Sequence, residues 1–147
     1  MLEGDLATVG RAANNLGIIA NMQGEYGRAV GSHTTAVGAF RRARNDQGVA
    51  EAHHNLGIAF RDQGKLFDAL RSADDAVREA TKADDASLRA QALAGRAEIR
   101  TVDGDAELAI REARLAIEVH RGLHDHVRMT EDQRILANAL AATGQVD

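Results

Sequence analysis

Apolar residues recur every three or four positions along most of the chain, a spacing that places them on one face of an α-helix. Val49, Ala52, Leu56 and Ala59 follow this spacing in one segment. The pattern stops at Gly64, which suits the left-handed residue that often ends a helix, and then resumes. The first ten residues read as the end of a loop that runs into a helix. The pattern predicts helices at residues 8–22, 26–44, 47–62, 66–83, 86–102, 105–122 and 127–142.

The helical pattern repeats with a period of 40 residues and without insertions. Glycine recurs at positions 24, 64, 104 and 144, and alanine recurs at 29, 69 and 109 and again at 36, 76 and 116. Because several independent columns share one period, the sequence predicts an all-α solenoid of antiparallel helix hairpins in a single domain, residues 1–147. Three complete repeats cover about residues 8–46, 47–86 and 87–126, and a partial copy at 127–147 adds one extra helix.

These columns resemble the tetratricopeptide repeat (TPR) family, in which a Leu-Gly pair lies on the first helix of each hairpin. In that family a small residue occupies the turn, and two alanines lie on the buried face of the second helix. The first copy holds Leu16, Gly17, Gly24, Ala29 and Ala36 at these positions. The 40-residue unit is similar to the variant found in bacterial regulators, signalling ATPases and kinesin light chains. The resemblance implies a right-handed superhelical solenoid whose concave groove binds a peptide or partner protein.

The sequence departs from the common TPR pattern in several ways. The usual unit is about 34 residues and often ends in proline, whereas this chain has no proline. HEAT repeats overlap the length and remain the second interpretation, although they lack this order of glycines and alanines. In the third copy Arg96 replaces the leucine that we expect to be buried. Arg96 either forms an ion pair with Asp74 or Asp75, or extends its charged end to solvent.

Composition narrows the functional classes. The chain has no cysteine, so it forms no disulfide and no thiolate metal site. No apolar run of about eighteen residues is present, and the first residues lack the pattern of a signal peptide, so we expect no membrane span and a cytoplasmic location. The net charge of −4, without an extended basic patch, disfavours nucleic-acid binding. Few aromatic residues and many alanines indicate helices that pack closely through small side chains.

Catalysis is poorly supported by the sequence. No phosphate-binding loop, nucleophile elbow or zincin helix is present. His120 and His124 lie four residues apart with His126 nearby, a spacing that could supply two zinc ligands. Exposed histidines at the end of a helix have a simpler explanation in the helix dipole. We therefore expect no enzymatic activity, no cofactor and no metal site.

The TPR resemblance assigns the groove to defined positions on the first helix of each hairpin. Asn14, Asn15 and Asn55 are candidate clamps for a peptide backbone, because an amide both donates and accepts hydrogen bonds. A structural role is equally open for Asn15 and Asn55. The predicted groove residues are Arg11, Asn14, Asn15, Ile18, Asn21, Met22, Glu51, His54, Asn55, Ile58, Arg61, Asp62, Gln91 and Glu98.

The expected function is protein–protein interaction, with a protein or peptide bound in this groove and a scaffold or regulatory role. Two alternatives stay open: a structural segment that packs on sister domains or on its own copy, and a sensor domain of a bacterial transcriptional regulator or signalling ATPase that binds a small ligand or oligopeptide. We expect the chain to be a segment of a larger protein. The last helix carries Ile135, Leu136 and Leu140, a face that suits a continuing stack or self-association.

Overall fold

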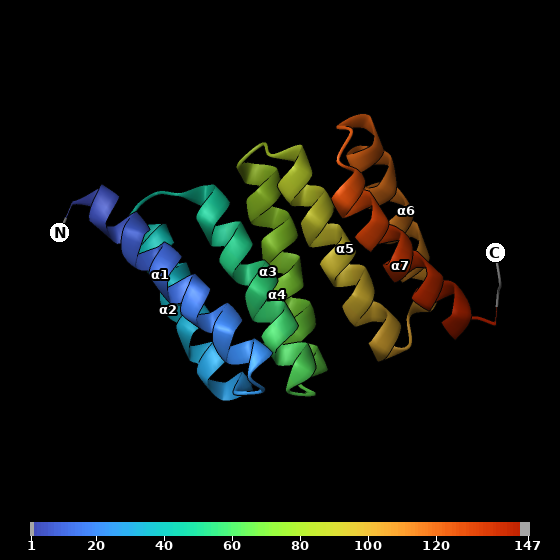
Figure 1. Ribbon diagram of the computed structural model, residues 1–147, viewed down its shortest axis with the longest axis horizontal. Helices are drawn as coiled ribbons and strands as arrows, with labels where there is room; N and C mark the ends of the chain where they lie inside the picture. The colour runs from blue at the N-terminus through green and yellow to red at the C-terminus, as the bar shows by residue number, and fades with distance from the viewer. Residues whose placement is uncertain (1, 145–147) are drawn as a thin grey trace.

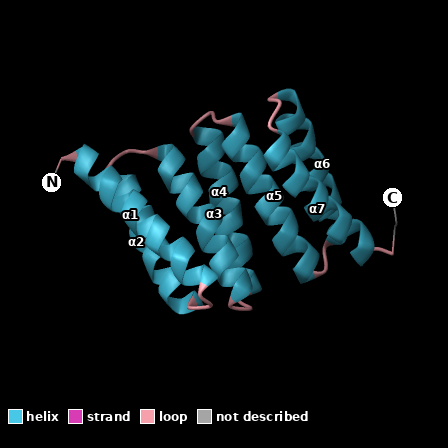
Figure 2. Ribbon diagram, viewed as in Figure 1, coloured by secondary structure: helices cyan, strands magenta, loops and turns pink. Residues whose placement is uncertain are grey.

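The computed structural model describes the backbone of residues 2–144, and this part of the chain forms helices and turns without strands. Figure 1 shows the helices side by side in chain order, and Figure 2 shows the short turns between them. The predicted all-α repeat solenoid is confirmed, and the predicted helix ends agree closely except at the start. The helices are α1 (Glu3–Met22), α2 (Tyr26–Arg42), α3 (Asp46–Asp62), α4 (Leu66–Lys82), α5 (Ala86–Asp103), α6 (Ala106–Gly122) and α7 (His126–Ala142).

Helix α1 begins earlier than the sequence predicts. The backbone N–H groups of Asp5 and Leu6 donate to the carbonyl of Leu2 at 3.0 and 3.1 Å, so the segment is already helical there. Leu6 is buried and anchors this first turn. The prediction of a loop over the first ten residues is wrong, because nothing in the segment ends a helix and Leu6 finds a place in the core.

A left-handed residue occurs at every turn, at intervals of 20 residues. Gly24, Gly64, Gly104 and Gly144 have φ between +77° and +96°, as their spacing predicts. The other three turns use Arg44, Asp84 and His124, with φ between +53° and +56°. A side chain in this conformation costs roughly 1–2 kcal/mol, so these turns need compensation. It comes from the residue that follows each of them, whose side-chain oxygen accepts a hydrogen bond from the next helix: Asn45 from Gly48, Asp85 from Leu88 and Asp125 from Arg128.

The helices form two layers. The odd-numbered helices α1, α3, α5 and α7 each contact the next odd-numbered helix along the stack. Among the described residues, α2, α4 and α6 make no such contacts with one another. The odd-numbered helices therefore lie closer together and form the inner, concave layer, while the even-numbered helices spread apart on the outside. Below, the inner face is the solvent-facing side of α1, α3, α5 and α7.

Alanine is the most frequent of the buried apolar residues in the described part of the chain. The six alanines of the two predicted columns, at 29, 69, 109, 36, 76 and 116, are all fully buried. Their small side chains let the outer helices approach the inner ones closely, and this confirms the interpretation of both columns. Larger buried side chains need a matching space. The ring of Phe40 on α2 fits between Gly10 of α1 and Gly48 of α3, where a Cβ atom at either glycine would overlap it.

The apolar residues of α7 point into the stack. Ile135 and Leu140 are buried in a cluster with α5 and α6, and Leu136 packs against the same cluster. These three residues are therefore not free for the continuing stack or the self-association that the sequence suggests for them. The physical reason is that α5 and α6 cover the apolar side of α7. In the same way α1 and α2 cover α3, and α3 and α4 cover α5. The free side of α7 instead carries exposed polar residues such as His126, Thr130 and Gln133.

We predict opposite effects for two glycine-to-alanine changes within helices. In Gly10→Ala the new Cβ would lie 2.8 Å from the Phe40 ring, so the free energy of unfolding should fall by about 1–3 kcal/mol. In Gly38→Ala, where nothing lies within 4 Å, it should rise by about 0.5–1 kcal/mol through helix propensity. Urea unfolding measures both. A second change, Phe40→Leu, should restore part of the loss in Gly10→Ala; equal effects at both glycines would contradict the fitted ring.

Candidate functional site

Polar side chains connect neighbouring inner helices along the whole stack. Asn21 on α1 donates from Nδ2 to Oδ2 of Asp62 on α3 at 2.9 Å. Arg61 on α3 forms an ion pair with Glu98 on α5 at 2.7 Å, and Arg134 on α7 reaches the same Glu98 at 3.2 Å. These bridges hold the four inner helices in register. They also fix the side chains that a molecule bound to the inner face would meet.

The predicted groove residues all lie on α1, α3 and α5, and they differ in how much they are exposed. Asn14 is buried, at 6% exposure. The half-buried ones are Asn21, His54, Asn55, Ile58, Arg61, Gln91 and Glu98. The exposed ones are Arg11, Asn15, Ile18, Met22, Glu51 and Asp62.

Asn14 and Asn55 form hydrogen bonds within the fold. Oδ1 of Asn14 accepts from Nδ1 of His33 at 2.7 Å and from Nδ2 of Asn55 at 3.2 Å. The His33 ring reaches Asn14 across Gly17, where a Cβ atom would overlap it. Burial lowers the pKa of His33 from 6.5 to about 4, so the ring is neutral at pH 7. This oxygen of Asn14 therefore joins α1, α2 and α3, whereas the exposed amide of Asn15 makes no hydrogen bond among the described residues.

A cavity of about 150 Å³ opens between α3, α5 and α7. The His54 ring lies against Gly95 at its wall. Burial, with the nearby charges of Arg61 and Arg128, lowers the pKa of His54 to about 4. The amide of Gln91 makes no hydrogen bond among the described residues and is available to a ligand. The lining residues are His54, Ile58, Gln91, Ala94, Gly95, Glu98, His120, Arg128, Glu131, Asp132 and Ile135.

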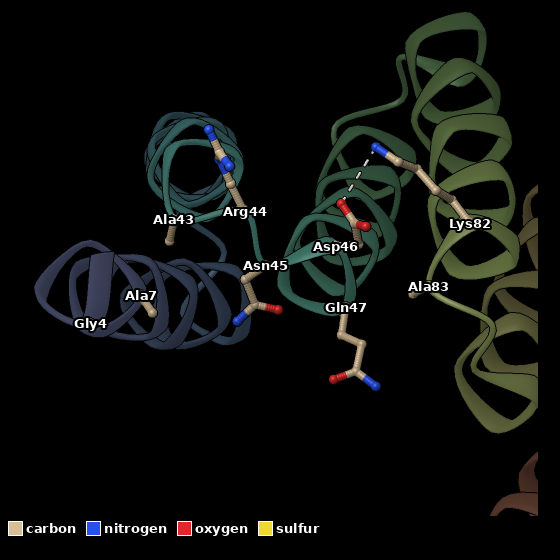
Figure 3. A pocket seen from close by; sticks show the side chains of 9 residues that line it. All are labelled: Gly4, Ala7, Ala43, Arg44, Asn45, Asp46, Gln47, Lys82 and Ala83. Atoms are coloured by element: carbon tan, nitrogen blue, oxygen red, sulfur yellow. Dashed lines mark ion pairs between the residues drawn. The ribbon is translucent and has the colours of Figure 1, made fainter. Parts of the chain in front are cut away.

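A larger depression of about 520 Å³ lies elsewhere, at the ends of α1, α3 and α4 and beside the turn that follows α2. Figure 3 shows Lys82 reaching across it toward Asp46, with which it forms an ion pair of 3.5 Å. Arg44 points away from this pair, and Gln47 points to another side. Because its polar groups do not converge, the depression is a weaker candidate site than the inner face.

Arg96 forms ion pairs, which confirms the first of the two interpretations that the sequence allows. Its Nη1 lies 3.0 Å from Asp74, and its Nη2 lies 2.6 Å from Glu112. Glu112 is buried on α6 and also binds Arg100 at 3.2 Å. Asp75 instead pairs with Arg78. Glu112 is not among the predicted partners of Arg96, and its carboxylate makes the partial burial of two arginines tolerable.

His120 is fully buried, so its interpretation as an exposed histidine at a helix end is wrong. Its Nδ1 lies 2.5 Å from Oδ2 of Asp132, and its Nε2 lies 3.4 Å from the carbonyl of Ser87. Burial raises the pKa of Asp132. His124 and His126 are exposed and stay outside this pair. In the part of the chain that the structure describes, no group of three potential ligands is placed to hold a metal ion.

Comparison with known proteins gives matches only among solved structures; no family model and no curated protein matches the sequence. The nearly identical TPR-like repeats of a kinesin light chain-like protein from Podosopora anserina match with a TM-score of 0.78 and 18% identity, over 92% of this chain and 67% of that one. BtubC (BKLC) from P. vanneervenii matches with a TM-score of 0.77 and 15% identity. This chain has a TPR-like fold. The match to BtubC covers 92% of this chain, which spans only 56% of the length of BtubC.

Asp132 and His120, which border the cavity, depart from the pattern of the TPR-like repeat. Asp132 occupies a column that holds alanine at positions 12, 52 and 92, and His120 occupies a column with Phe40 and Ala80. Both polar residues therefore depart from an apolar column, and together they border the cavity. A search for such departures would have pointed to this end of the inner face. None of the described helices is long and apolar enough to cross a membrane.

We predict that the TPR-like stack loses stability in mild acid. His33 and His54 have pKa values of about 4 in the folded state and 6.5 when exposed, so the unfolded chain binds more protons between these values. Stability is complete above pH 6.5 and falls as the pH drops toward 4, by on the order of 3 kcal/mol for buried His33. Asp132, whose pKa is raised, opposes this trend.

Urea unfolding at pH values from 7.5 to 4.5 measures the effect. His33→Gln keeps an amide donor toward Asn14. It should lower the slope of the unfolding free energy against pH by the amount that corresponds to about one bound proton. The matched control His126→Gln changes an exposed histidine and should leave the profile unchanged. A profile of His33→Gln that retains the full native slope would show that this ring is already charged in the folded protein.

Proposed function

We propose that the inner face of this chain binds an extended peptide or a helix from a partner protein, as part of a scaffold or regulatory assembly. One observation carries the proposal: exposed apolar side chains and a cavity occur on the same face. Met22 on α1 is 82% exposed and Ile18 lies beside it, while the cavity opens between α3, α5 and α7. Solenoids of stacked repeats offer extended concave surfaces of this kind to their partners.

The chemistry of the face suits a main chain more than a single charged group. Asn15 and Gln91 have amides without partners in the described part of the chain, and each amide can pair with both an N–H and a C=O group. Arginines and carboxylates alternate along the face and largely neutralise one another. A ligand would therefore gain from apolar contact at Ile18 and Met22 and from hydrogen bonds at the amides.

The polar bridges favour a rigid groove. Arg61, Glu98 and Arg134 hold one another through ion pairs at 2.7 and 3.2 Å, so their side chains are already ordered before a ligand arrives. Preordered side chains lower the entropic cost of binding. The cavity, at about 150 Å³, has room for one side chain of a bound peptide.

We predict that partner binding is lost when the inner face is changed and survives the same kind of change outside. The inner variant combines Met22→Glu with Gln91→Trp, which adds a charge at one end and fills the cavity at the other. The matched control is Leu115→Glu on the outer helix α6, where the leucine is 51% exposed. A protein captured from a host-type lysate by the native chain should bind the control equally and the inner variant at least tenfold more weakly.

Mass spectrometry identifies the captured protein, and isothermal titration with its purified form gives the affinities. Circular dichroism must show native helicity in both variants. A partner that binds the inner variant and the native chain equally, or one that only Leu115→Glu loses, would refute binding at the inner face. Binding of a small molecule from the lysate, seen as thermal stabilisation without a captured protein, would support the sensor alternative.

A further inference from the structure

One side of α1 exposes a stripe of apolar residues that faces away from the rest of the stack. Val9, Leu16 and Ile19 are 39–61% exposed, and Ala12 lies between them. Their spacing of three and four residues places them on one face of the helix. This stripe is separate from Ile18 and Met22 of the inner face, so the proposed groove does not explain it.

The repeat register shows what the same positions do elsewhere. Forty residues later, Val49, Ala52, Leu56 and Ala59 on α3 are at most 8% exposed. They are buried because the preceding hairpin covers them: Val49 and Ala52 pack with α2, and Ala59 packs with α1 and α2. On α5 and α7 this side is likewise covered by the preceding hairpin. The stripe on α1 is thus the uncovered copy of an interface that the chain forms three times.

The two ends of the stack are not alike. At the far end, the free side of α7 presents His126, Thr130 and Gln133 in place of the buried Leu6, Gly10 and half-buried Ala13 of α1. A polar side that faces solvent suits the end of a stack. The α1 stripe, with its exposed leucine and isoleucine, does not.

The first turn of α1 also contains a residue that belongs to the repeat pattern. Asp5 occupies the column in which Asn45, Asp85 and Asp125 cap the following helix. In the structure Asp5 lies inside α1, because the helix runs back to Glu3. The sequence therefore places a capping residue where a helix would start if another turn preceded it in register.

We propose that the α1 stripe is the acceptor for a helix–turn–helix repeat unit stacked ahead of α1 in the same polypeptide, with its second helix packed on Val9, Ala12 and Leu16. Continuity with the three interfaces of this chain argues for this occupant. A second copy of the chain suits the stripe less well. The stripe covers eleven residues of one helix, with about 15 Å between its first and last residues, whereas stable complexes bury about 800 Å² per partner. A unit joined through the chain is held at an effective concentration of millimolar or more, so a small interface suffices.

The experiment adds such a unit and follows one thiol. A copy of residues 45–84, which contains α3 and α4, is fused directly ahead of Asp5, so the 40-residue register continues. This unit is chosen because Ala80 of α4 leaves room for Thr8, whereas Phe40 of α2 requires a glycine at that position. Leu16→Cys is introduced with and without the added unit. The chain has no native cysteine, so maleimide labelling reports this one site.

The thiol at position 16 should react at least tenfold more slowly when the unit is present, while a Leu115→Cys control on α6 reacts equally in both proteins. Urea unfolding of the extended chain should be one transition with a higher midpoint than the parent. Equal reactivity at position 16 would overturn the proposal, because the added unit would then not cover the stripe. Protection in the parent chain that grows with protein concentration would overturn it in favour of a second copy.

Discussion

Two of the rings buried between helices in this protein lie against glycines of the neighbouring helices. Phe40 of α2 fits between Gly10 and Gly48, and His33 of α2 lies over Gly17. Elsewhere many of the buried contacts between helices are made by alanine, whose small side chain lets the helices approach closely. Each ring thus fixes the rotation and height of one helix relative to the next. The inner face depends on this, because its side chains come from helices positioned by these contacts.

Charge has replaced apolar packing toward the C-terminal end of the stack. Arg96 lies in the column of Leu56 and is held by Glu112, while Asp132 lies in an alanine column and is held by His120. A buried ion pair stabilises a fold weakly but costs several kcal/mol when one partner is lost, so such pairs specify partners more than they add stability. Here Asp132 and His120 also form part of the cavity wall. The inner face consequently exposes the apolar side chains of Ile18 and Met22 at α1, and is polar and hollowed at α5 and α7.

The sequence predicts the repeat, its 40-residue period and nearly all helix ends, because these depend on local features. Gly64 by itself indicates a left-handed turn, and the alanine columns indicate close packing of the helices. The left-handed turn at Arg44 has no such signature, since the capping side chain of Asn45 makes it possible. Contacts across the stack were harder to predict. Arg96 pairs with Glu112 on α6 as well as with the predicted Asp74. The burial of His120 on α6 depends on Asp132, which lies on α7.

The same reasoning explains why Leu16 and Leu56 differ although they share a column. The residues around each leucine give no reason for a difference, yet Leu16 is exposed and Leu56 is buried. Within the described residues a hairpin covers Leu56 and none covers Leu16. Helix α1 borders both candidate surfaces, with the stripe on one side and Ile18 and Met22 on the next. A unit stacked on the stripe would bring its own inner helix alongside these two residues, as α1 lies alongside α3. The inner face would then continue past α1, and the part of it that carries Ile18 and Met22 would become its middle.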